Sequence, residues 1–484
     1  MIKLRRVLPF FLAALLVWTG CASTVKKVKP APDNVYYVRA GGSDRNDGLS
    51  ESTPFRSLFK ALAAASAVRA QTVVVIGTLD LQSEQTSNDE RVFILQGGGR
   101  DLVITITGKA GAGGDERAVL SAEGTGRRVA LIRGETNLRF ENIEISGGSS
   151  ELQGGGLVIG QGSIVTLGPG ATLRNNKASG GGGGVVVIPG GRLFISGAVI
   201  AENSSEAVGG GIAGAGEMIV MDSGEVRDNT APAGGGIAVF DGCVFTLKGG
   251  SIVFNRAGLF GGGVAIQNGS ADIRGGLVGD NQSALSGGGI GIMNKASLIQ
   301  SGGEIRRNTA GEHGGGIAGD DSSAISLTGG IIAANRAAQN GGGVFTASAF
   351  SKGKGAVITG SGADANNAAA GRALYLYREA PQFIDDNIGE EIVMENADVI
   401  ESANRAATGE DAKTALDETV TDETTSAEDT ESVPVETVTG ETATDETDET
   451  ALDETDETDE TVIETGAGEI HVGSPDGEGD ELSE

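Results

Sequence analysis

The chain has 484 residues, among them 81 glycines, 66 acidic and 36 basic residues, and its formal net charge is −30. Glycine at about one residue in six disfavours a helical architecture, because each interior glycine costs a helix about 1 kcal/mol. The acidity excludes a nucleic-acid binder with a basic surface. Two cysteines and two histidines exclude a disulfide scaffold and a Cys/His zinc site, so we expect no cofactor.

The N-terminus has the organisation of an export signal. Basic residues precede an apolar run over 7–18, which is short for a membrane span and ends in Thr-Gly-Cys at Cys21. This pattern resembles a bacterial lipoprotein signal, which implies that residues 1–20 are removed and that Cys21 carries the lipid, palmitate included. The alternative is an ordinary secretory signal with Cys21 free. Residues 21–34 are predicted to form a lipidated tether.

Residues 35–148 are predicted to form an N-terminal cap followed by irregular early coils. A short capping helix is expected over 57–65. Alternating or continuous apolar runs predict strands in this region, at 72–76, 91–95, 102–107, 129–133 and 138–145.

An internal repeat of about 27 residues occupies 149–370. Glycine triplets end at Gly156, Gly184, Gly211, Gly236, Gly263, Gly289, Gly316 and Gly343. Each copy then contains short apolar stretches bounded by glycines, which are typical of strands. Three such strands are too short for three hairpins but suit one coil of a parallel β-helix, in which each strand pairs with its equivalent in the next coil.

An asparagine recurs in phase with the triplets, at Asn176, Asn203, Asn229, Asn255, Asn281, Asn308 and Asn335. An amide both donates and accepts, so stacked asparagines at one inward turn can form a structural ladder. The triplets are expected to supply positive φ angles and a thin wall at another corner. Gln300, Ala271, Gly214 and Gly319 interrupt the inward apolar rows, and we expect looser packing there.

The segment 36–64 contains Tyr37-Val38, Asp47-Gly48 and Pro54-Phe55, followed by Leu58 and Ala61. It resembles the entry segment of bacterial pectin-lyase-like proteins. That resemblance implies an all-β, right-handed parallel β-helix whose short helix caps the open end. The glycine and asparagine repeats also resemble those of polymorphic outer-membrane proteins.

Candidate catalytic and metal residues are few. Glu312-His313-Gly314 lies just before Asp320 and Asp321, but polygalacturonases, which share this fold, have the aspartate pair before the histidine. We therefore interpret His313 as an exposed turn residue and expect no catalytic set. Asp320 and Asp321 are the candidates for a weak calcium site, and Cys243 is interpreted as a small wall residue.

The C-terminal part divides in two. Residues 371–407 are predicted to close the β-helix. Residues 408–484 contain 28 acidic residues and one lysine, a net charge of −27 that leaves −3 for the remaining chain. Such a segment buries too little apolar surface to fold, so we expect a disordered acidic tail. It is either a solvated end or a flexible arm for basic partners or cations.

These features predict a non-enzymatic envelope lipoprotein that displays a β-helix rod as a surface adhesin or scaffold. It would be held at the bacterial outer membrane through Cys21, with host or envelope glycans or proteins as partners and no nucleic acid. The alternative is a glycan-binding or polysaccharide-degrading protein of lyase type.

Overall fold

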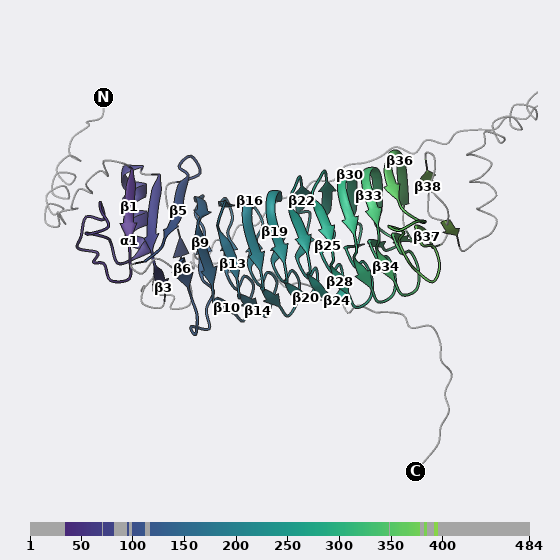
Figure 1. Ribbon diagram of the computed structural model, residues 1–484. Helices are drawn as coiled ribbons and strands as arrows, with labels where there is room; N and C mark the ends of the chain where they lie inside the picture. The colour runs from purple at the N-terminus through teal and green to yellow at the C-terminus, as the bar shows by residue number, and fades with distance from the viewer. Residues whose placement is uncertain are drawn as a thin grey trace, which may run out of the picture. The chain divides into compact units, whose positions relative to one another are not determined.

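The computed structural model describes residues 34–69, 71–81, 94–95, 99–111, 117–347, 349–377, 382–384 and 392–394. The expected signal (1–20), the lipidated Cys21 and the acidic tail (408–484) lie outside these residues. The described part is a solenoid of about ten turns, in which successive coils stack side by side along one axis (Figure 1). The predicted parallel β-helix is confirmed.

The coils repeat because equivalent residues of consecutive turns pair in parallel register. Ile237 pairs with Val264, and Val264 pairs with Ile290, so one turn takes 26 or 27 residues here. These strands belong to sheet B, whose members follow the glycine triplets in the regular coils: β4 (Ile94–Leu95), β7 (Ala130–Ile132), β11 (Leu157–Ile159), β15 (Val185–Val187), β18 (Ile212–Gly214), β21 (Ile237–Phe240), β25 (Val264–Gln267), β29 (Ile290–Met293), β32 (Ile317–Gly319), β35 (Val344–Thr346), β37 (Leu374–Leu376) and β39 (Ile392–Met394).

Sheet A forms the longest wall and includes the early coils. A pair of glycines interrupts it in several regular turns, as at Gly249-Gly250 between β22 and β23. Its strands are β1 (Val35–Val38), β2 (Thr72–Ile76), β3 (Thr78–Asp80), β5 (Ile104–Lys109), β6 (Ala118–Ser121), β8 (Asn137–Glu141), β9 (Ile143–Ser146), β12 (Ile164–Leu167), β13 (Thr172–Arg174), β16 (Arg192–Ala201), β19 (Met218–Arg227), β22 (Val244–Leu247), β23 (Ser251–Val253), β26 (Ser270–Ile273), β27 (Leu277–Gly279), β30 (Ser297–Arg306), β33 (Ala324–Ala333), β36 (Ala349–Ile358) and β38 (Gln382–Ile384).

Sheet C is the shortest wall and connects each ladder asparagine to the next glycine triplet. Its strands are β10 (Ser149–Ser150), β14 (Lys177–Ala178), β17 (Ser204–Ser205), β20 (Thr230–Ala233), β24 (Arg256–Phe260), β28 (Gln282–Ser283), β31 (Thr309–Ala310) and β34 (Arg336–Ala337).

The helix α1 (Leu58–Val68) begins one residue later and ends three residues later than the predicted 57–65. Ser57 is its N-cap and accepts a hydrogen bond from the Lys60 amide at 3.2 Å. The helix ends at Arg69, which adopts a left-handed conformation with φ 55°. Its buried face, which includes Leu58 and Leu62, belongs to the same apolar core as the coils.

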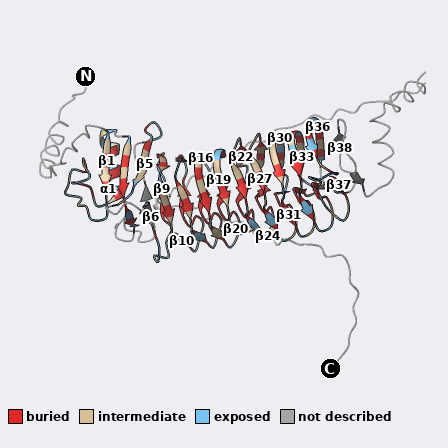
Figure 2. Ribbon diagram, in the orientation of Figure 1, coloured by how far each residue is buried: buried red, intermediate tan, exposed pale blue. Residues whose placement is uncertain are grey.

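The core is one continuous apolar column, and buried positions run along the strands through the solenoid (Figure 2). Gln300 lies in it at 1% exposure, and its Oε1 has no hydrogen-bond partner among the described residues. The expected loose packing at Gly214 is wrong. A Cβ there would lie 2.4 Å from Ile219 Cδ1 and 3.2 Å from Cys243 Sγ, so neighbouring side chains already fill the space.

The seven in-phase asparagines lie in one buried stack at the turn between sheets A and C. In a typical step, the side-chain Nδ2 of Asn229 donates to Asn255 Oδ1 at 3.0 Å, and the backbone N–H of Asn229 donates to the same oxygen at 3.1 Å. The Nδ2 group also donates to the Ile200 carbonyl of the previous coil at 2.9 Å. The stack continues to an eighth member, Asn366, which sequence analysis missed.

Candidate functional site

The outer face of sheet B changes in character along the solenoid. In each three-residue strand the first and third side chains point inward and the middle one points outward, as the period of two requires. The outward residues are small in the middle coils, for example Ala265 in β25 and Ala318 in β32. They become aromatic towards the C-terminal end, with Phe345 in β35 and Tyr375 in β37. Phe345 and Tyr375 are paired residues of neighbouring strands.

Two further rings join this pair to form a cluster that we call the aromatic platform (His313, Phe345, Tyr375 and Tyr377). The centroids of His313 and Phe345 are 4.5 Å apart with an interplanar angle of 15°. Phe345 also stacks on Tyr375 at 5.7 Å and 17°, and it contacts Tyr377 at 6.3 Å and 32°. The small angles make this a layered stack rather than an edge-to-face packing.

His313 reaches the platform from the position just before a glycine triplet. The equivalent position two coils earlier holds Phe260. The Phe260 ring lies over Gly291, the outward residue of the following coil, since a Cβ on Gly291 would lie 2.6 Å from Phe260 Cδ2. This position therefore places a side chain over the outward residue of the next coil. The interpretation of His313 as a simple exposed turn residue is corrected, since its ring is partly buried and stacked on Phe345.

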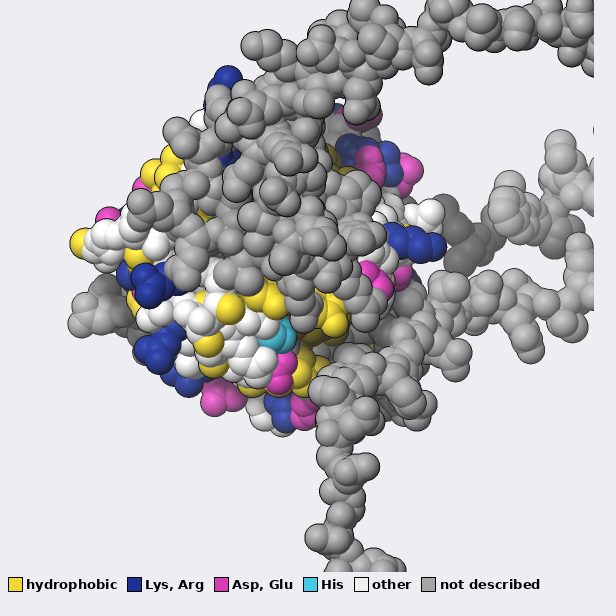
Figure 3. Space-filling view, turned by 90° about the vertical axis from the view of Figure 1, so that its right-hand side faces the viewer, with side chains coloured by type: hydrophobic (Ala, Val, Ile, Leu, Met, Phe, Trp, Pro, Cys, Tyr) yellow, Lys and Arg dark blue, Asp and Glu magenta, His cyan; other side chains and the backbone are white. Residues whose placement is uncertain are grey.

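The imidazole of His313 is biased towards its neutral form. Burial lowers its pKa, and the Glu312 carboxylate opposes that shift only in part. Its Nδ1 atom is buried and has no hydrogen-bond partner among the described residues. Figure 3 faces this end of the solenoid, where hydrophobic side chains share the surface with the histidine shown in cyan.

The two aspartates considered for calcium have other surroundings. The Asp320 carboxylate accepts hydrogen bonds from the Asn294 amide at 2.8 Å and from the Ser322 amide and hydroxyl at 3.0 Å each. It therefore holds two adjacent turns together. Asp321 is exposed beside it. Within the described ranges, no group of three or more His, Cys, Asp or Glu side chains could hold a metal ion.

Cys243 is fully buried in the core, and burial raises its pKa to about 12. It fills space as a small wall residue beside Gly214. Among the described residues, no helix has the length and apolar character needed to cross a membrane.

Comparisons with known proteins add one structural neighbour. No family model matches the chain, and no curated protein matches its sequence. Among solved structures, the chain is similar to a GH136 lacto-N-biosidase from Eubacterium ramulus, with 13% identity and a TM-score of 0.25. The match covers 75% of this chain and 67% of that enzyme. At this identity and TM-score, the activity of the enzyme is not transferred to this chain.

Proposed function

We propose that this protein is a non-enzymatic lipoprotein of the bacterial envelope whose β-solenoid binds host or envelope glycans. It would act as a surface adhesin or scaffold, held at the outer membrane by the lipid on Cys21. The observation that carries the proposal is the aromatic platform on the outer face of sheet B.

The chemistry of the platform fits a sugar. The C–H faces of a pyranose ring are apolar and flat, so they can pack against the ring edges and the uncovered end of the stack, while tyrosine keeps a hydroxyl for sugar hydroxyls. A layered stack is pre-organised, so little side-chain entropy is lost on binding. Aromatic residues make up only 4% of this chain, so a group of three rings and an imidazole is a local concentration.

Binding to an oligosaccharide array tests the proposal. The whole mature chain is prepared as its Cys21→Ser variant, and the array spans neutral hexoses, N-acetylhexosamines and uronates. Phe345 is the hub of the platform, so Phe345→Ala should weaken binding about tenfold or more. The matched control is Phe260→Ala, which removes an aromatic ring from the same outer face but outside the platform, and its affinity should be unchanged.

Three outcomes contradict the proposal. The first is that no glycan on the array binds. The second is that the parent chain, Phe345→Ala and Phe260→Ala bind with equal affinity while their thermal unfolding is unchanged. The third is the appearance of new reducing ends after incubation. That result would establish the alternative, a glycan-degrading enzyme.

A further inference from the structure

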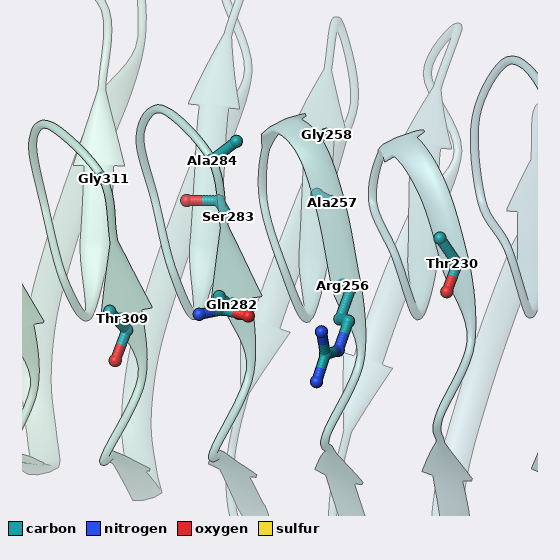
Figure 4. Close-up of a pocket in the computed structure, with 9 residues that line it drawn as sticks. All are labelled: Thr230, Arg256, Ala257, Gly258, Gln282, Ser283, Ala284, Thr309 and Gly311. Atoms are coloured by element: carbon teal, nitrogen blue, oxygen red, sulfur yellow. The ribbon is translucent and has the colours of Figure 1, made fainter.

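A shallow groove of about 470 Å³ lies on the outer face of sheet C, and its last lining residue, Gly311, is two residues before His313 of the aromatic platform. It crosses four consecutive turns, so its long direction follows the stack of coils (Figure 4). The lining residues come from β20, β24, β28 and β31 and the turns that follow them: Thr230, Arg256, Ala257, Gly258, Gln282, Ser283, Ala284, Thr309 and Gly311.

The groove follows from the pattern of the short strands. The first residue of each strand points outward, and it is polar in all four turns, as at Arg256 and Gln282. The outward position two residues later holds Pro232 in the first turn and Gly258, Ala284 and Gly311 in the next three, where there is almost no side chain. A row of polar side chains therefore borders a strip of bare backbone, and this difference in height makes the hollow.

The charge of the groove is uncompensated. Arg256 is exposed, and no hydrogen bond or ion pair holds its guanidinium among the described residues. Arginines elsewhere on the solenoid are paired, such as Arg274 with Asp272 at 2.7 Å and Arg307 with Asp280 at 2.7 Å. None of the nine lining residues is acidic. The groove is therefore complementary to an anion.

Ser283 lies between the two outward positions of its turn, so its side chain points into the solenoid and not into the groove. Its side chain is only 2% exposed, and its Oγ has no hydrogen-bond partner in the described part of the chain. The equivalent Ser205 donates to the Gly180 carbonyl at 2.5 Å. The ligand-facing polar groups are therefore the outward side chains, such as Arg256 and Gln282.

We infer that this groove binds an extended acidic peptide segment of a partner protein, with an Asp or Glu carboxylate on Arg256. A guanidinium forms two parallel hydrogen bonds to a carboxylate. The hydroxyls of Thr230 and Thr309 and the amide of Gln282 both donate and accept. They match the alternating N–H and C=O groups of an extended backbone.

The dimensions agree with a short peptide. Consecutive coils lie about 4.8 Å apart, so Thr230 and Thr309 are separated by roughly 14 Å, which is about four residues of extended chain. None of the lining residues is aromatic, so a pyranose ring finds no stacking partner here. The groove and the aromatic platform share no residue and differ in ligand class, so the groove goes beyond the proposed glycan binding.

Fluorescence anisotropy with a labelled hexaglutamate peptide tests the inference on the whole mature chain carrying Cys21→Ser. Hexaglutamate should bind, and hexaglutamine should bind about tenfold more weakly. Arg256→Gln should lower the affinity for hexaglutamate about tenfold or more, and Gln282→Ala should lower it severalfold. Both side chains are exposed, so neither change should unfold the coil. Arg274→Gln removes the same charge from sheet A and is the matched control, with less than about a twofold effect.

Three results would overturn the inference. They are no binding of hexaglutamate at millimolar concentration, equal binding by Arg256→Gln and Arg274→Gln, and tighter Arg256-dependent binding of tetragalacturonate than of hexaglutamate. The last result would assign the groove to an acidic glycan. Since Phe345→Ala leaves the groove intact, failure of either site is seen independently of the other.

Discussion

In the asparagine ladder, one side chain bonds at least two backbone groups in each turn, and Asn366 bonds three. The Oδ1 atom of Asn366 accepts hydrogen bonds from the backbone N–H of Asn335 and from its side-chain Nδ2, both at 2.9 Å. The Nδ2 group of Asn366 donates to the Ile332 carbonyl at 2.9 Å and to the Thr359 carbonyl at 2.8 Å. The bonds to Asn335 and Ile332 are buried, and the bond to Thr359 is partly buried. The next residue, Asn367, is exposed.

This contrast gives a prediction for two adjacent asparagines. Asn366→Ala should lower the free energy of unfolding by about 2–4 kcal/mol, because it leaves buried donors and acceptors without partners. Asn367→Ala should cost less than about 0.5 kcal/mol. Chemical denaturation of the two variants and the unchanged chain measures both values. Similar losses in the two variants would mean that the ladder does not stabilise the turn.

At the scale of the element, the glycine triplet has a separate requirement at each position. Gly261 has φ +67°, a left-handed conformation that favours glycine. A Cβ on Gly262 would lie 2.3 Å from the Gly288 carbonyl oxygen and 2.6 Å from the Gln282 carbonyl carbon. A Cβ on Gly263 would lie 2.9 Å from the ladder amide of Asn281. The triplet therefore lets neighbouring coils approach at backbone distance.

The middle glycine gives the sharpest test of this packing. Gly262→Ala should destabilise the solenoid by about 3 kcal/mol, because its methyl group meets backbone atoms that cannot rotate away. Gly41→Ala is the matched control, since a Cβ at Gly41 has no neighbour within 4 Å and its φ is not positive. Thermal unfolding should show a lower midpoint for Gly262→Ala alone. An unchanged midpoint would mean that the coils can separate at this corner without cost.

At the scale of the whole molecule, the charge divides unevenly between the solenoid and the segment that follows it. Residues 408–484 account for −27 of the net −30. Exposed ion pairs along the solenoid wall, such as Lys177 with Glu206 and Lys248 with Asp222, balance much of the remaining charge. The overall acidity therefore does not describe the surface of the solenoid, where an unpaired Arg256 can attract an anion.

The proposed attachment of the molecule to the membrane depends on one residue outside the described part. Cells that express the chain and are fed an alkynyl palmitate analogue should label it, and Cys21→Ala should abolish the label. Cys243→Ala is the control and should keep it, because a fully buried thiol is not modified in the folded protein. Label that persists in Cys21→Ala would show that the anchor is elsewhere or that Cys21 remains free.

The sequence by itself determined the coil, its period and the inward rows, because the same residue types recur in phase and each must satisfy the same local packing. Asn366 was not predicted as a ladder residue because it follows Asn335 by 31 residues, after an insertion that breaks the period. Only the tertiary structure decided the two surfaces. His313, Phe345 and Tyr375 come from three different coils, and Thr230 and Thr309 are three turns apart. These residues come together only because their side chains point outward on neighbouring coils. A linear repeat does not show which side chains point outward or which other side chains cover them.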